Sequence, residues 1–107
     1  MQEVTDVFQA IADPNRRKLL DLVAKRERSV QDLAEHFDIT VQGVSQHLQL
    51  LAAAGLVTRR KVGRFRYYRA QPRQLKRVHT WVSRYERFWA TRLDRLGEYL
   101  NGKKDEA

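Results

Sequence analysis

The chain of 107 residues is long enough for one domain with a modest hydrophobic core, at a size where a partner subunit often completes the fold. Its 42% hydrophobic residues argue against disorder, and the absence of cysteine excludes disulfides, thiolate metal sites and cysteine nucleophiles. Because no apolar run is long enough to cross a membrane and the first residues lack the features of a signal peptide, we expect a cytoplasmic protein.

The net charge of +8 is concentrated in the middle of the chain. Residues 39–85 hold ten Lys and Arg and no acidic residue, whereas residues 1–38 hold six basic and eight acidic residues and residues 86–107 hold five of each. An acid-free stretch of this length favours a basic face directed at nucleic acid. An anionic membrane is the rival partner, but the stretch contains no long basic amphipathic helix, so we expect no membrane binding.

Apolar spacing and capping residues predict four helices in the first half of the chain. Asp13, Ser29 and Thr40 are expected N-caps, and Gly55 is expected to end the fourth helix. The expected helices cover residues 4–11, 14–25, 30–37 and 41–54. The last two helices have the proportions of a helix-turn-helix over residues 30–54, although helical hairpins of other kinds are common.

The outer face of the fourth expected helix has an unusual composition. No charged residue lies between Ile39 and Thr58, and the face carries Gln42, Ser45, Gln46 and Gln49. Glutamine pairs bidentately with adenine, and serine contacts base edges or phosphates, so this face suits the major groove of DNA. The alternative is an uncharged surface with no binding role.

A β-hairpin is expected over residues 56–69. Strand-like segments at 56–61 and 65–69 flank Val62-Gly63-Arg64, which supplies a glycine for the turn. The hairpin is expected to display five cations beside the fourth helix for phosphate contacts, namely Arg59, Arg60, Lys61, Arg64 and Arg66. Its aromatic residues, Phe65, Tyr67 and Tyr68, fit packing within the hairpin better than base stacking, which is the alternative.

After Gln71-Pro72, a long helix is expected over residues 73–101, followed by a flexible tail at 103–107. Its apolar residues follow almost a strict heptad, and one small domain cannot easily cover them all. We therefore expect the first and last helices to form a two-fold dimer interface, with packing of the last helix on the first as the alternative. The expected interface residues are Val4, Phe8, Val78, Val82, Tyr85, Trp89, Leu93 and Leu96.

Catalytic and metal-binding patterns are lacking in the sequence. His36, His47 and His79 lie in three different expected helices, and no nucleotide-binding, zinc-protease or nucleophile-elbow motif is present. We therefore expect no enzyme, no metal site and no cofactor.

Four segments together resemble the ArsR/SmtB family of winged-helix transcriptional repressors. They are Ala12 to Leu20 (ADPNRRKLL), Val44 to Leu48 (VSQHL), Ala54 to Val57 (AGLV) and Gly63 to Tyr68 (GRFRYY), and the resemblance covers residues 4–72. It implies a homodimer on an inverted-repeat operator, with recognition helices in successive major grooves and wings over the flanking DNA backbone. It also implies groove contacts from Thr40, Gln42, Ser45 and Gln46 and a wing-tip contact from Arg64, while His47 either touches DNA or packs.

The chain departs from the metal-sensing members of that family. Their cysteines align with Ser29, Gln31 and Ala34 here, and His79 stands alone, with Trp89 near the place of a second ligand. The resemblance is therefore to the non-metal, autorepressor-like branch, and it identifies no effector.

The expected fold is mostly α with one β-hairpin: a winged helix-turn-helix domain over residues 1–102 with long N- and C-terminal dimerisation helices. The expected function is sequence-specific binding of double-stranded DNA by a homodimeric repressor. A basic RNA-binding or ribosome-associated protein is the alternative. The full set of expected DNA contacts is Thr40, Gln42, Ser45, Gln46, His47, Gln49, Arg59, Lys61, Arg64 and Arg66.

Overall fold

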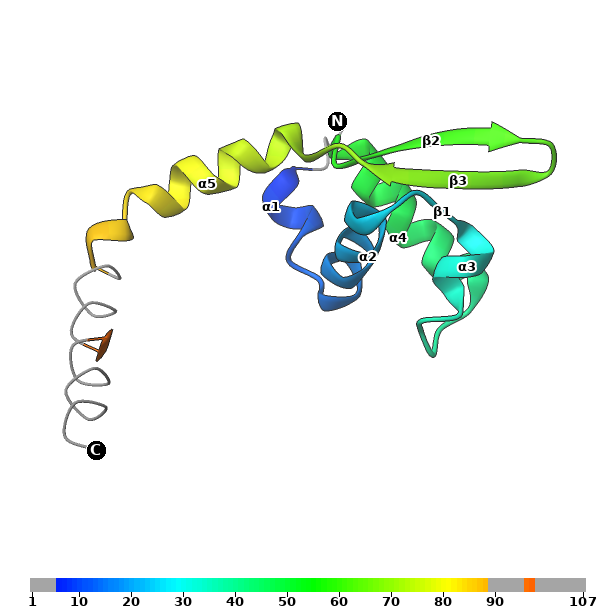
Figure 1. Ribbon diagram of the computed structural model, residues 1–107, viewed down its shortest axis with the longest axis horizontal. Coiled ribbons are helices and arrows are strands. Elements are labelled where there is room, and N and C mark those ends of the chain that lie inside the picture. The colour runs from blue at the N-terminus through cyan, green and yellow to red at the C-terminus, as the bar shows by residue number, and fades with distance from the viewer. Residues whose placement is uncertain (1–5, 89–95, 98–107) are drawn as a thin grey trace, which may run out of the picture. The chain divides into compact units, whose positions relative to one another are not determined.

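The computed structural model describes residues 6–88 and 96–97, which belong to two compact units that divide between Arg77 and Val78. The first unit holds helices α1 (Val7–Ala10), α2 (Pro14–Lys25), α3 (Val30–Ala34) and α4 (Val41–Ala53). It also holds strands β1 (Arg28–Ser29), β2 (Val57–Val62) and β3 (Phe65–Ala70). A short turn of 3-10 helix, η1 (Pro72–Gln74), leads into α5 (Leu75–Ser83) (Figure 1).

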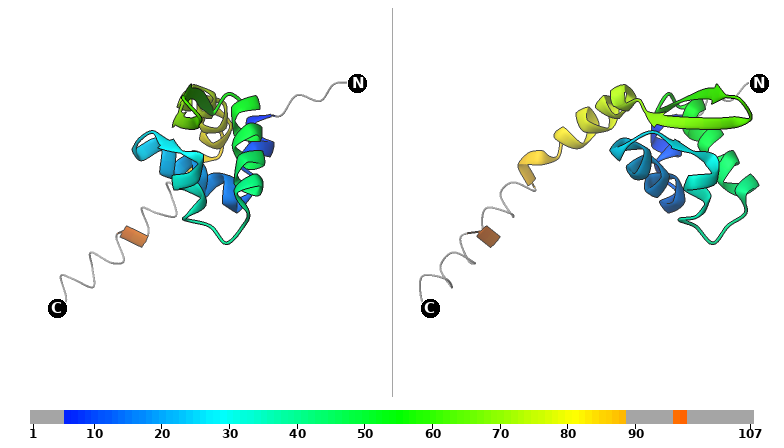
Figure 2. Two further views of the ribbon diagram at one scale, coloured as in Figure 1. Left: turned by 90° about the vertical axis from the view of Figure 1, so that its right-hand side faces the viewer. Right: turned by 45° about the vertical axis from the view of Figure 1, so that its right-hand side comes forward.

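The three strands form an antiparallel sheet in the order β1-β3-β2. β2 and β3 make the expected hairpin, here called the wing, in which Val57 pairs with Ala70 and Val62 with Phe65. Helices α2, α3 and α4 lie on one side of the wing (Figures 1 and 2). The core between these helices and the sheet is made by Val7, Ala10, Leu19, Leu20, Val23, Val30, Leu33, Val44, Leu48, Leu51, Ala54, Leu56, Val57 and Tyr68.

The predicted helix caps are confirmed. The Asp13 carboxylate accepts from the Asn15 amide at 2.8 Å, and the Ser29 hydroxyl accepts from the Asp32 amide at 3.1 Å. Such bonds satisfy amides that have no partner within the first helical turn. At the end of α4, Gly55 has φ +79°, a left-handed conformation that a residue with a side chain adopts only with strain.

The described elements differ from the predicted ones in three places. α3 ends at Ala34 instead of residue 37, because the amides of residues 35–37 bond to carbonyls three residues back and tighten the chain into a turn. α1 begins at Val7 after its N-cap Asp6, and the expected start at Val4 lies outside the described residues. The sequence does not predict β1, since two residues are too few to show a strand period.

Within the described residues, the long helix expected over residues 73–101 is interrupted: α5 ends at Ser83, residues 84–85 form a turn, and residues 86–88 and 96–97 are helical. The Ser83 hydroxyl donates to the His79 carbonyl at 2.7 Å, a bond of the kind that bends helices. The next two amides, of Arg84 and Tyr85, then bond to carbonyls three residues back. The rest of the expected helix falls mostly outside the described residues.

Candidate nucleic-acid interface

The outer face of α4 is set by its buried face. Val44, Leu48 and Leu51 are fully buried, which determines the side of the helix that faces the core. The helical period then turns Gln42, Gln46 and Gln49 to the solvent side, where all three are exposed, and leaves Ser45 half-buried at its edge. Thr40 is exposed at the start of α4, and its hydroxyl oxygen accepts from the Gly43 amide at 2.9 Å.

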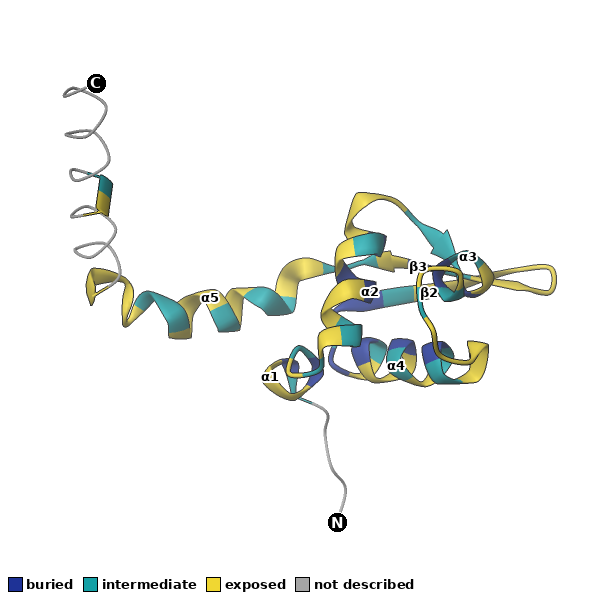
Figure 3. Ribbon diagram, turned by 90° about the horizontal axis from the view of Figure 1, so that it is seen from below, coloured by how far each residue is buried: buried dark blue, intermediate teal, exposed yellow. Residues whose placement is uncertain are grey.

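The wing has two faces with different roles. Across the β2–β3 pair, Arg59 lies opposite Tyr68 and Lys61 opposite Arg66, so these residues share the face that carries the buried Tyr68. Lys61 and Arg66 lie nearer the end of the hairpin, where side chains are exposed (Figure 3). Like charges directly opposite each other destabilise a sheet. The repulsion between Lys61 and Arg66 would be offset if a polyanion bound there.

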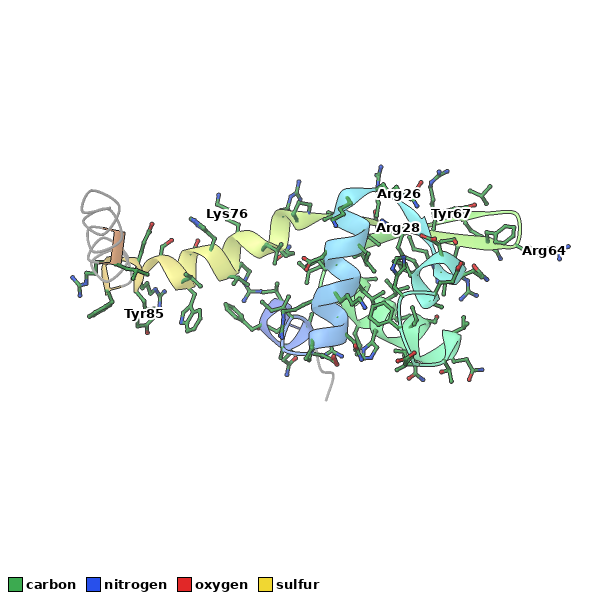
Figure 4. The ribbon with its side chains drawn as sticks, turned by 60° about the horizontal axis from the view of Figure 1, so that its bottom comes forward. Arg26, Arg28, Arg64, Tyr67, Lys76 and Tyr85 are labelled. Carbon is green, nitrogen blue, oxygen red and sulfur yellow. The ribbon has the colours of Figure 1, made fainter. Side chains whose placement is uncertain are left out.

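A groove of about 560 Å³ separates the wing from the helix-turn-helix. It brings together five of the ten predicted DNA contacts, and no carboxylate lies among the described residues that line it. This surface is called the basic groove, and its lining residues are Val30, Gln31, Val41, Gln42, Ser45, Lys61, Gly63, Arg64 and Arg66. Arg64 extends from the far end of the hairpin (Figure 4). The groove therefore joins uncharged hydrogen-bonding groups on α4 to cations on the wing.

Gln31 is a groove residue that the sequence prediction did not place at the DNA surface. It is exposed on α3 and lines the basic groove with Gln42 and Ser45. One sequence signal could have placed Gln31 at the surface: it follows the buried Val30 and lies on the outer side of a short amphipathic helix. Only the tertiary packing of α3 beside α4 shows that this side faces the wing.

The remaining predicted contacts lie outside the lining of the groove. Gln46, Gln49 and Arg59 are exposed, and Thr40 lies at the N-terminus of α4. His47 is half-buried, and its Nδ1 lies 3.2 Å from a guanidinium nitrogen of Arg16. The structure therefore places His47 against α2, away from the groove.

Arg60 does not lie beside the other wing cations, contrary to the prediction. It lies opposite Tyr67, on the other face of the hairpin, and its Nε and a terminal nitrogen donate to the two Glu27 carboxylate oxygens at 2.7 and 2.8 Å. This bidentate bond lowers the pKa of Glu27 and raises the pKa of Arg60. The charge of Arg60 is thus compensated within the protein.

Two of the three wing aromatics pack as predicted. Tyr68 is 1% exposed in the core, and the Arg60 guanidinium lies 5.7 Å from the centre of the Tyr67 ring. Phe65 differs, because it is 45% exposed near the turn.

An exposed aromatic cluster occupies the described part of the second unit. The Trp81 and Tyr85 rings are 5.7 Å apart edge to face, and Tyr85 and Phe88 are 6.5 Å apart. With Val82 they line an open apolar hollow of about 350 Å³. Of the predicted interface residues, Phe8, Tyr85 and Leu96 are exposed and Val78 and Val82 half-buried, while Val4, Trp89 and Leu93 lie outside the described residues.

Within the described ranges, residues 6–88 and 96–97, no three His, Asp or Glu side chains lie close enough to hold a metal ion. Across those same ranges, no helix has the length and apolar character needed to span a membrane.

Comparison with known proteins identifies a DNA-binding family. Residues 11–60 match a family model described as a helix-turn-helix domain. The transcriptional repressor SdpR of Bacillus subtilis is 37% identical over 79 residues, which cover 74% of this chain and 88% of SdpR. A transcriptional repressor SmtB homolog of Synechocystis is 39% identical over 67 residues, which cover 63% of this chain and 51% of that protein.

A solved structure supports the same relationship. The ArsR-like transcriptional regulator from Rhodococcus sp. RHA1 superimposes with a TM-score of 0.68 at 30% identity, covering 90% of this chain and 88% of that one. The winged helix-turn-helix fold predicted from the sequence is thereby confirmed, apart from its long terminal helices.

Proposed function

The chain belongs to the ArsR/SmtB family of DNA-binding transcriptional repressors, and on that basis we propose that it binds an inverted-repeat operator as a homodimer, without sensing a metal. Each α4 enters a major groove, and each wing follows the flanking phosphate backbone. Two-fold symmetry places the half-sites about one helical turn apart, roughly 10–10.5 bp.

The basic groove is the observation that carries this proposal. Gln42 and Ser45 on α4 supply donors and acceptors for base edges, while Lys61, Arg64 and Arg66 supply phosphate contacts on the opposite wall. Structured RNA is a poorer fit, because its deep, narrow major groove does not admit a helix.

The operator contacts divide into two groups. Thr40, Gln42, Ser45, Gln46 and Gln49 read or position bases, and Gln31 joins them from α3. Arg59, Lys61, Arg64 and Arg66 contact phosphates, and Arg64 at the turn also reaches a minor groove. His47 acts through the protein instead of touching DNA.

Metal independence is supported by the side chains at the positions where metal-sensing relatives carry cysteine. Ser29 caps α3, Gln31 lines the basic groove, and Ala34 has no ligand atom in its side chain. The chain has no cysteine elsewhere. A regulator without catalytic activity is the corresponding expectation.

The direct test is a titration of the purified protein against DNA from upstream of its own coding sequence. A scrambled duplex and a structured RNA of equal length serve as competitors, at two salt concentrations and with either zinc or chelator. We expect the upstream duplex to bind most tightly and zinc to have no effect. Equal affinity for the scrambled duplex, or preference for the RNA, would refute the proposal.

Gln46→Ala is expected to relax base preference at one position of each half-site. A bidentate glutamine–adenine pair contributes about 1–3 kcal/mol of discrimination against the wrong base. Binding selection from a randomised operator library measures this effect. A uniform loss of affinity across all sequences would show that Gln46 only positions the helix.

Homodimerisation through the helical surfaces is supported by the exposed aromatic cluster. Trp81, Tyr85 and Phe88 are 48%, 44% and 55% exposed, and a second copy of the chain supplies a surface of matching character.

Tyr85→Asp is expected to give monomers in sedimentation and to weaken operator binding on the order of 10²-fold, because the two half-sites are no longer linked. Thr80→Asp is the matched control, since it adds the same charge at an exposed position of α5 outside the cluster. An intact Tyr85→Asp dimer would place the interface elsewhere.

A further inference from the structure

Arg16 makes an unusual set of contacts for a surface arginine. Its Nε donates to the Ala10 carbonyl at 2.7 Å, and one terminal nitrogen donates to the Gln9 carbonyl at 3.1 Å. Its other terminal nitrogen lies 3.2 Å from His47 Nδ1 and 3.8 Å from the Asp13 carboxylate. The side chain is only 17% exposed. Through these contacts a single guanidinium in α2 joins the end of α1 to α4.

The place of His47 on α4 separates it from the groove residues. Five residues at about 100° each put His47 roughly 140° around the helix from Gln42. Val44, Leu48 and Leu51 fix α4 to the core by apolar contact, which has no preferred direction. A hydrogen bond at the border of that apolar stripe is directional and restricts rotation of the helix about its axis.

The contact also determines the proton position on His47. A guanidinium can only donate, so Nδ1 must accept and Nε2 carries the proton of a neutral ring. A protonated imidazole would lose this bond and would place a second cation beside Arg16.

Among the described residues, the charged groups seen next to the imidazole lie in α2 and at its N-cap. They are Arg16 and, beyond its guanidinium, Asp13, while α1 presents the Gln9 and Ala10 carbonyls and α4 itself carries no charge. Of the charged groups on other elements that pack against α4, Asp32 contacts Arg28, Arg60 contacts Glu27, and Lys61 lines the basic groove.

We propose that Arg16 and His47 form a positioning pair that sets the rotation of α4 against α1 and α2, and through it the presentation of the glutamine face to DNA. The inference rests on the proposed function, since it concerns the same operator complex. It assigns a role to two residues whose side chains do not touch DNA. Binding to the operator then depends on the hydrogen-bond acceptor at His47 Nδ1, which the Arg16 guanidinium faces.

His47→Asn and His47→Leu provide the main test. An asparagine carbonyl oxygen can take the place of Nδ1, whereas leucine cannot accept a hydrogen bond. On the upstream duplex, His47→Asn should keep the wild-type affinity, because its carbonyl oxygen still accepts from Arg16. His47→Leu should bind about tenfold more weakly, as expected when a hydrogen bond to a charged group is removed.

Arg16→Ala and Arg17→Ala form a matched pair. Arg17 also donates to a carbonyl after α1, that of Ile11, at 2.7 Å. Arg17 is exposed, however, and its bond does not connect to α4. Arg16→Ala should weaken operator binding about tenfold, leave the salt slope unchanged and leave binding to scrambled duplex unchanged. Arg17→Ala should leave all three unchanged. Circular dichroism checks that each variant folds. If Arg16→Ala does not fold, the His47 variants alone test whether the pair positions α4.

Several results would overturn the proposed role of Arg16 and His47. A lower salt slope in His47→Asn would make His47 a phosphate contact. An unchanged operator affinity in folded Arg16→Ala would remove Arg16 from any positioning role. Wild-type protein that does not prefer the upstream duplex to its scrambled form would instead refute the proposed function itself.

Discussion

Combined replacement of Lys61, Arg64 and Arg66 by alanine is expected to remove most of the DNA affinity while leaving the protein folded. Removal of one phosphate contact lowers the slope of log K against log salt by about 0.9, so removal of three lowers it by about 2.7 per half-site. Near 0.15 M salt, the affinity should fall on the order of 10²-fold per half-site. Because Lys61 and Arg66 repel each other across the strands, their replacement should not weaken the hairpin.

Fluorescence anisotropy over a series of salt concentrations measures both the affinity and the slope. Arg60→Ala is the matched control, because it also removes a wing arginine, but from the opposite face and from a bond with Glu27. Its salt slope should stay close to that of the wild type. If Arg60→Ala lowered the slope as much as Arg66→Ala alone, the basic groove would not be the phosphate-binding surface.

The local signals in the sequence predict most of the elements around the groove. Asp13, Ser29 and Thr40 bond to amides within two or three residues of themselves, so their capping roles are visible without the fold. The same is true of Gly63, whose φ of +62° serves a turn within the hairpin. These features place α2, α3, α4 and the wing nearly where the structure has them.

The features that sequence reasoning missed depend on residues far apart in the chain. β1 is a strand only because Arg28 and Ser29 pair with Tyr68 and Tyr67. Arg60 is removed from the DNA-facing set by Glu27, which is 33 residues earlier. Periodicity along the sequence carries no information on such pairs. The sequence alone likewise leaves open whether the wing aromatics pack or stack on bases. The register of β3 in the sheet shows that Tyr68 belongs to the core.

Affinity and sequence preference are thus expected to come from different walls of one groove. The α4 wall carries amide and hydroxyl groups without charge, and the wing wall carries cations without a nearby carboxylate among the lining residues. Phosphate contacts alone would bind any duplex, and the uncharged helix alone would bind weakly. Their relative placement depends on how the wing is held to the helices.

Tyr68→Ala is expected to destabilise the protein by about 3–5 kcal/mol, the range for truncation of a large buried aromatic side chain. Tyr68 is 1% exposed in β3, the central strand, and β3 packs against α2 and α3. Removing its ring leaves a cavity at the junction of sheet and helices. Since small domains have about 5–15 kcal/mol of total stability, this destabilisation should be evident as a lower midpoint in urea denaturation.

Phe65→Ala provides the comparison, because Phe65 lies on the same strand but is 45% exposed near the turn. Its free energy of unfolding should change by less than about 1 kcal/mol, as is usual for surface positions. If Phe65 instead stacks on a base, Phe65→Ala would weaken DNA binding with little effect on stability. Similar urea midpoints for Tyr68→Ala and the wild type would contradict the assignment of Tyr68 as the anchor of the wing. A wing without that anchor could not hold Lys61 and Arg66 in fixed register against α4.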